Sequence, residues 1–132
     1  MFNKEEFVNQ IKQQGYSIVE NVLDAEYIAR AKIKLLKAIE TESLYNKSSD
    51  YADYGMVLLC SLYDKVFTEL FDNFHLTEPF NSILGDGCIV YAYTSSSMPP
   101  NKTNYSRRIH VDSPRIIPGY ITNMGATILL DD

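Results

Sequence analysis

Apolar residues in the first part of the chain recur at the spacing of a helix. The pattern predicts a helix over residues 3–14, in which Asn3 caps the start and Phe2 packs against Phe7 across the cap. Gly15 suits the end of this helix, because glycine readily adopts the left-handed conformation that follows a last turn. Residues 16–20 then alternate in polarity and predict a short strand.

Two further helices are expected before residue 80. Asp24 is a suitable cap for a helix over residues 24–41, whose apolar positions follow the helical period. Residues 43–55 are polar and rich in tyrosine, and they are expected to form a loop. Apolar residues between positions 57 and 71 again fit a helix: Val57, Leu58, Leu62, Val66, Leu70 and Phe71.

The second part of the chain has the character of strands. Residues 88–94 are β-branched and aromatic, as in a buried strand, and a loop with two prolines follows them. A second extended segment is expected over residues 108–112, and Pro118 with Gly119 marks a turn. Residues 126–130 predict a third strand.

Helices followed by strands predict the α+β class, with the helices packed outside a sheet. We expect one domain over residues 1–132, comprising a mainly helical flank (1–80) and the first strands of the core (81–132). The strand at 126–130 is too apolar for an exposed sheet edge. The domain is therefore expected to be incomplete, with self-association through that edge as a possible consequence.

The composition of the chain indicates which partners and which location are not expected for the protein. The chain has 12 basic and 17 acidic residues and a net charge of −5, which disfavours nucleic acid as a partner. Membrane insertion is not expected either, because no apolar run approaches the length of a bilayer span. Cys60 and Cys88 lack metal-binding spacing and are expected to be reduced thiols in a cytoplasmic protein.

The candidate chemistry lies at His110 and Asp112. On an extended segment, residues two apart project from the same side, so the imidazole and the carboxylate are expected to lie together while Ile109 and Val111 pack on the other side. One histidine and one carboxylate are two of the three ligands of the facial triad that binds Fe(II). The alternative is a surface His–Asp pair, which contributes at most about 1 kcal/mol.

Four motifs, taken in order, add a family resemblance. They are Gly15-Tyr16 with the following SIVENVLD, the strand that ends in a Pro-Pro loop, His110-Val-Asp112, and the GATILLDD segment that starts at Gly125. This order resembles the N-terminal half of the phytanoyl-CoA dioxygenase family, which are Fe(II)- and 2-oxoglutarate-dependent oxygenases. The resemblance spans most of the chain and implies a double-stranded β-helix (jelly-roll) core with helices outside it.

The resemblance also implies roles for individual residues. His110 and Asp112 correspond to iron ligands, while Thr94 and Ile128 correspond to positions that line the 2-oxoglutarate pocket. For Thr94 and Ile128 the alternative is ordinary barrel packing. A carboxylate at Asp112 favours hydroxylation or a related oxidation of a small organic substrate, because halogenating relatives have a small residue there.

The chain departs from the family pattern after the GATILLDD segment. The family continues with a distal iron-binding histidine and then an arginine that binds 2-oxoglutarate, and neither is present here. The other histidine, His75, precedes the predicted strands and is expected to be structural. Two functions therefore remain open: the N-terminal part of a dioxygenase, inactive by itself, or a non-catalytic remnant that associates through its unpaired sheet edge.

Overall fold

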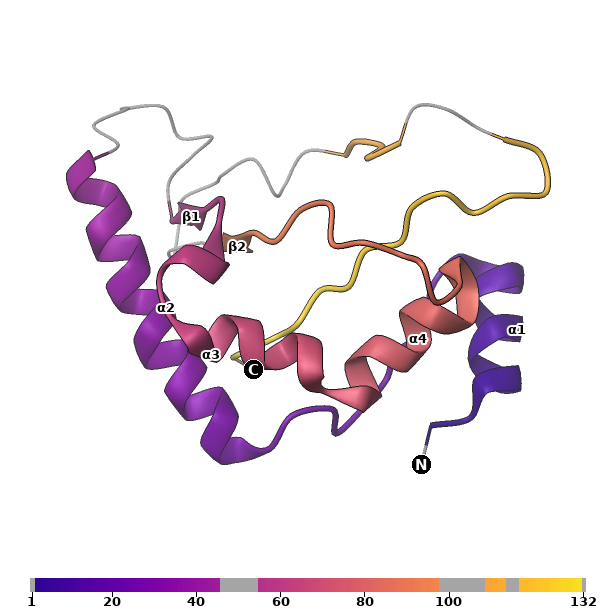
Figure 1. The fold of residues 1–132 in the computed structure, drawn as a ribbon, viewed down its shortest axis with the longest axis horizontal. Coiled ribbons are helices and arrows are strands. Elements are labelled where there is room, and N and C mark those ends of the chain that lie inside the picture. Colours follow the sequence, from indigo (N-terminus) through magenta and orange to yellow (C-terminus); the bar gives the residue numbers. More distant parts are fainter. Residues whose placement is uncertain (1, 46–54, 98–108, 114–116, 132) are drawn as a thin grey trace.

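The computed structural model describes residues 2–45, 55–97, 109–113 and 117–131. Four helices, two short 3-10 helices and a two-stranded antiparallel sheet make up the regular structure of this part (Figure 1). In chain order they are α1 (Lys4–Gln14), α2 (Ala25–Tyr45), β1 (Met56–Val57), η1 (Cys60–Leu62), α3 (Lys65–Thr68), η2 (Glu69–Asp72), α4 (Phe74–Leu84) and β2 (Ser95–Ser96). This mixture of helix and sheet agrees with the expected α+β class, but the described residues show no jelly-roll core.

The first two helices form where the sequence predicts them. At α1, the Asn3 side chain accepts a hydrogen bond from the Glu6 amide at 3.2 Å, and the Phe2 and Phe7 rings lie 5.4 Å apart. Gly15 ends the helix at a φ of 84°. At α2, the Asp24 carboxylate accepts from the Tyr27 amide at 2.6 Å. Both predicted helices are therefore confirmed, and α2 extends four residues beyond the predicted position 41.

The core lies between α2 and the segment that runs from β1 to α3. Ala31 and Ala38 on α2 are buried, and their small side chains allow close approach of this segment. The residues buried against them are Val57, Cys60, Val66 and Phe67. Partly buried residues extend this cluster, and they include Tyr93 and Leu130 from the second part of the chain. The helical body therefore anchors two of the segments that were predicted to be strands.

The prediction of one helix over residues 57–71 is wrong. Val57 pairs with Ser95 in the sheet, η1 follows, and a new helix starts at Lys65. Asp64 causes this restart, because its side chain accepts a hydrogen bond from the Val66 amide at 3.0 Å. Leu58 and Leu62 are exposed, so the helical spacing of the apolar residues does not reflect one buried helical face.

Helix α4 was not predicted from the sequence. Asn73 caps it by accepting a hydrogen bond from the His75 amide at 2.9 Å. Pro79 lies inside this helix and is buried, although proline lacks an amide hydrogen and usually marks a helix end or a kink. Helix α4 packs against α1 (Figure 1). Between these two helices, Lys4 Nζ lies 3.8 Å from Glu78 Oε1.

The strands predicted over residues 16–20, 88–94 and 126–130 are not strands in the structure. Nor does a strand form over residues 109–112, while position 108 lies outside the described residues. Strands need backbone partners, and in the described part of the chain the ladder joins only β1 and β2, with Tyr93 adding a single bridge to Leu59. Ile89, Tyr91 and Leu129 are exposed as a result. The predicted turn at Pro118 and Gly119 is confirmed, since the Tyr120 amide donates to the Ile117 carbonyl at 3.0 Å.

Glycine is required where the two short strands begin and end. Gly55 precedes β1 at a φ of 71°, and its amide carbonyl accepts from the Ser97 amide at 2.9 Å. A Cβ atom at position 55 would overlap the carbonyl oxygen of Ser97. The close approach of these two backbones therefore depends on the missing side chain.

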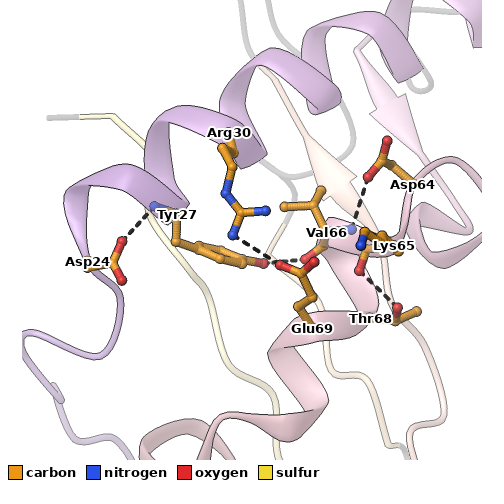
Figure 2. A network of polar contacts seen from close by, with 8 residues as sticks. All are labelled: Asp24, Tyr27, Arg30, Asp64, Lys65, Val66, Thr68 and Glu69. Carbon is orange, nitrogen blue, oxygen red and sulfur yellow. Dashed lines mark hydrogen bonds and ion pairs between the residues drawn. The ribbon is translucent and has the colours of Figure 1, made fainter.

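A polar network connects α2 to α3 and η2 at the edge of the core (Figure 2). The Tyr27 hydroxyl donates to the Val66 carbonyl at 2.6 Å, and Arg30 Nη2 lies 3.1 Å from Glu69 Oε2. The Arg30 guanidinium also stands 5.5 Å from the centre of the Tyr27 ring. Burial raises the pKa of Tyr27 to about 12, and the nearby Glu69 charge adds to this effect.

Removing the Tyr27 hydroxyl should destabilise the helical body. We expect Tyr27→Phe to lower the free energy of unfolding in urea by about 1 kcal/mol at neutral pH, because the Val66 carbonyl loses its donor. The exposed Tyr16→Phe change is the matched control and should have no effect.

The same variant should change the response to alkaline pH. The folded chain holds the Tyr27 proton up to about pH 12, whereas an unfolded tyrosine releases it at about pH 10. This contribution to stability is complete below pH 10 and is lost as the pH rises toward 12. Wild-type stability should therefore fall more steeply than that of Tyr27→Phe in this window; parallel curves would contradict the raised pKa of the buried Tyr27 phenol.

Candidate metal centre

His110 and Asp112 lie side by side in the structure. His110 Nε2 is 3.1 Å from Asp112 Oδ1, and the two residues occupy alternate positions in a segment without helical turns. The two side chains were expected to lie together and they do, although the segment is not a strand and its backbone bends at Asp112.

A separation of 3.1 Å suits two different chemistries. Metal–ligand bonds of about 2.1 Å at a right angle place two donor atoms about 3 Å apart, so the pair fits adjacent positions on an octahedral metal ion. The same distance fits a hydrogen bond from an imidazole N–H to a carboxylate oxygen. The pair therefore fits a metal by geometry and by donor type, and a protonated imidazole would form an ion pair instead.

The surroundings of the pair are open. The His110 and Asp112 side chains are 41% and 72% exposed, and Ile109 and Val111 are exposed as well. The expected packing of Ile109 and Val111 is therefore wrong for this chain. Apolar packing there would need a neighbouring layer, and the described residues place none against it.

A third ligand does not join the pair from the described ranges. Across residues 2–45, 55–97, 109–113 and 117–131, no three His, Cys, Asp or Glu side chains lie close enough together to hold a metal ion. His75 lies in the first turn of α4, exposed, with its ring 6.1 Å from that of Phe74. Iron ligation by His110 and Asp112 thus remains a prediction that rests on two donors.

The two predicted pocket residues lie in separate extended segments. Thr94 is exposed and sits between the Tyr93 bridge and β2. Ile128 is half-buried, two residues before Leu130 contacts the core. Their proposed contact with 2-oxoglutarate remains a prediction.

Tyr93 fixes the segment that carries Thr94, a role that the sequence pattern did not indicate. Its hydroxyl donates to the Phe67 carbonyl at 3.0 Å, and its ring makes edge contacts with Phe67 and Phe71. Its carbonyl accepts from the Cys60 amide at 3.3 Å. Burial raises the pKa of Tyr93 well above its ordinary value, so this phenol stays neutral and acts as a structural donor. The sequence feature that could have indicated this role is a tyrosine near the end of an apolar run.

Ion pairs hold other segments against α2. Lys34 Nζ lies 2.6 Å from Asp64 Oδ2, and this contact with Lys34 lowers the pKa of the Asp64 carboxyl. Lys32 Nζ lies 2.8 Å from Asp131 Oδ1, which brings the segment containing Ile128 back to the helical body. These contacts are solvent-exposed, so they orient segments more than they stabilise them.

Comparison with known proteins gives distant relatives. Two curated proteins, uncharacterized proteins of Mycobacterium bovis and Mycobacterium tuberculosis, are each 24% identical to the chain over 125 residues. The match covers 89% of this chain and 46% of each relative, so the chain spans about half the length of the curated relatives it matches. No family model matches the chain. No solved structure matches it either. At this identity the relatives assign neither a family nor an activity.

A metal titration can separate the two chemistries of the pair. Co(II) is a paramagnetic stand-in for Fe(II), and it should broaden the ring proton signals of His110 at lower concentration than those of His75, the internal control. Replacing one of two ligands should weaken binding, so Asp112→Ala should need at least about tenfold more Co(II) for the same broadening. Equal broadening of both histidines would favour the surface ion pair.

Proposed function

We propose that this chain is part of a non-haem Fe(II)- and 2-oxoglutarate-dependent dioxygenase similar to the phytanoyl-CoA dioxygenase family. The complete protein would hydroxylate or otherwise oxidise a small organic substrate. The observation that carries the proposal is the 3.1 Å approach of His110 Nε2 to Asp112 Oδ1, because these are the donor types and the spacing of two adjacent facial-triad ligands.

Each residue of the pair would have a defined task. His110 would donate the lone pair of a neutral ring nitrogen, and Asp112 would supply a negative oxygen that offsets the charge of the metal. Fe(II) with 2-oxoglutarate, when bound, would supply the oxidising chemistry at a substrate C–H bond. The protein would contribute coordination geometry, exclusion of water and orientation of the substrate carbon.

The open surroundings of the pair are consistent with a half-site. More than half the length of each curated relative lies outside the match, which leaves room there for a distal histidine and a 2-oxoglutarate-binding arginine. Strands from such a segment would give residues 88–94 and 126–130 the neighbours that a jelly-roll requires. Thr94 and Ile128 would then line the co-substrate pocket. The free thiols of Cys60 and Cys88 fit a cytoplasmic location for the enzyme.

A non-catalytic module is the second candidate. The exposure of Ile89, Tyr91 and Leu129 favours it, because unpaired apolar segments recruit further strands. Such a module would associate through its unpaired sheet edge, and His110 with Asp112 would be a surface pair. Activity in a longer chain separates this candidate from the enzyme.

Succinate production tests the enzyme directly. With Fe(II), ascorbate and 2-oxoglutarate, the 132-residue chain should form no succinate above the level of its Asp112→Ala variant, since two protein ligands hold iron weakly. A chain extended to the length of the relatives should form succinate. Activity of the extended chain should be lost in His110→Ala and in Asp112→Ala, and retained in the matched control His75→Ala.

Two results would contradict the proposal. Succinate formation by the extended Asp112→Ala variant would show that the pair does not hold the metal. An extended, folded chain without 2-oxoglutarate turnover for any small organic substrate, and without the Co(II) preference for His110, would leave the non-catalytic module.

A further inference from the structure

Helix α2 carries three exposed apolar residues on the side away from the one that packs on the core. Its core face consists of Tyr27, Ala31, Leu35 and Ala38. On the other side Ile33, Leu36 and Leu44 are 67%, 58% and 69% exposed. A helix at the surface normally has a polar outer face, and Figure 1 shows α2 along one edge of the described chain. The outer face of α2 therefore has the composition of a contact surface.

The outer face has the spacing of a helix–helix seam. Ile33, Lys37, Glu40 and Leu44 are separated by four, three and four residues, the alternation that packs one helix against another in a coiled coil. Apolar residues stand at the two ends of this seam, and two opposite charges stand in the middle.

The two central charges differ from the other charged residues of α2. Arg30, Lys32 and Lys34 each form a salt bridge with an acidic side chain of the helical body or the last segment. Lys37 and Glu40 are exposed, and the described part of the chain shows no salt bridge for either. The seam thus presents one cation and one anion to an outside partner.

We propose that this partner is a second copy of the chain, with the two α2 helices packed antiparallel across a twofold axis. With the axis midway between positions 38 and 39, Ile33 of each copy faces Leu44 of the other. The same register places Lys37 of each copy opposite Glu40 of the other. One twofold contact therefore makes two apolar pairs and two ion pairs from a single surface, as an isologous interface requires.

Charge decides the orientation of this contact. A parallel arrangement would place Lys37 against Lys37 and Glu40 against Glu40, and like charges directly opposite each other disfavour association. Leu36 lies beside the seam and is covered in either orientation. The antiparallel arrangement is the one that satisfies both the apolar and the charged positions.

The contact is short, and this sets its strength. Residues 33–44 span about 16 Å of helix at 1.5 Å per residue, which buries less surface than a permanent dimer needs. The dimer should therefore be weak and should form as concentration rises. It uses neither His110 nor Asp112, so it is independent of the proposed function.

Sedimentation velocity of the 132-residue chain between about 1 and about 200 µM tests the contact. The chain should shift from monomer to dimer over this range. Lys37→Glu and Glu40→Lys should each weaken the dimer at least about tenfold, because each converts both ion pairs into like-charge contacts. Leu62→Glu is the matched control: Leu62 is 76% exposed, lies on η1, and its replacement should leave the dimer unchanged.

Mixing the two charge variants gives the sharpest result. Lys37→Glu presents two acids and Glu40→Lys presents two bases, so an equimolar mixture should form a heterodimer although each variant alone is monomeric. The double variant Lys37→Glu with Glu40→Lys should recover the homodimer. Circular dichroism of each variant checks that α2 remains folded.

Three outcomes would overturn the proposal. A chain that stays monomeric over the whole range has no such contact. A dimer that ignores both single charge reversals uses another surface, such as the exposed segment at residues 88–92. Separate charge variants that fail to associate on mixing, while retaining helix content, would exclude the antiparallel register.

Discussion

Close packing of α2 against the segment from Val57 to Phe67 is the contact on which the rest of the structure depends. Two alanines at the centre of the helix, Ala31 and Ala38, let the neighbouring backbone approach and bury Val57 and Val66 almost completely. The Tyr27 hydroxyl completes this contact at its edge by donating to the backbone carbonyl of the buried Val66. The later segments of the chain are organised by this body: Tyr93 hydrogen bonds to it, Leu130 packs on it, and Asp131 pairs with it.

The sequence correctly predicted the elements that depend on residues close to one another in the chain. The caps at Asn3 and Asp24 and the turn at Gly119 act within a few residues, and each was found where expected. The helix expected at 57–71 failed because its apolar residues are divided between a strand and three short helices, and some of them are exposed to solvent. Helix α4 was not predicted; it contains Pro79, a residue that usually marks a helix end or a kink, and the structure buries this proline within the helix.

The candidate site shows the same division between local and distant determinants. The proximity of His110 and Asp112 was predicted from their two-residue spacing, and the structure places their side chains 3.1 Å apart. Their exposure was not predictable, because it depends on which segments cover residues 109–113. Strand formation at 88–94 and 126–130 likewise needs partners distant in sequence, and β-propensity reports only how well a residue fits a sheet that already exists.

The two surfaces that we propose to be functional have different requirements. The His110–Asp112 pair is a two-donor arrangement that needs a further ligand and an apolar cover before it can hold iron firmly. The outer face of α2 belongs to the part of the structure that is already packed, and its pattern of charges is self-complementary. This face lies on the packed helical body, whereas residues 88–92 and 121–129 form no strand in the structure.

Hydrogen exchange, followed by mass spectrometry on the 132-residue chain, tests most directly whether the helical body is packed while the later segments form no strands. Amides of α2 within residues 27–39 and of α3 should exchange slowly, because they belong to the packed body, while amides at residues 88–92 and 121–129 should exchange close to the rate of an unstructured chain. If the amides of residues 88–92 were protected from exchange as strongly as those of α2, this account of the structure would be contradicted. It would show that these segments already have strand partners and that a sheet core forms without further polypeptide.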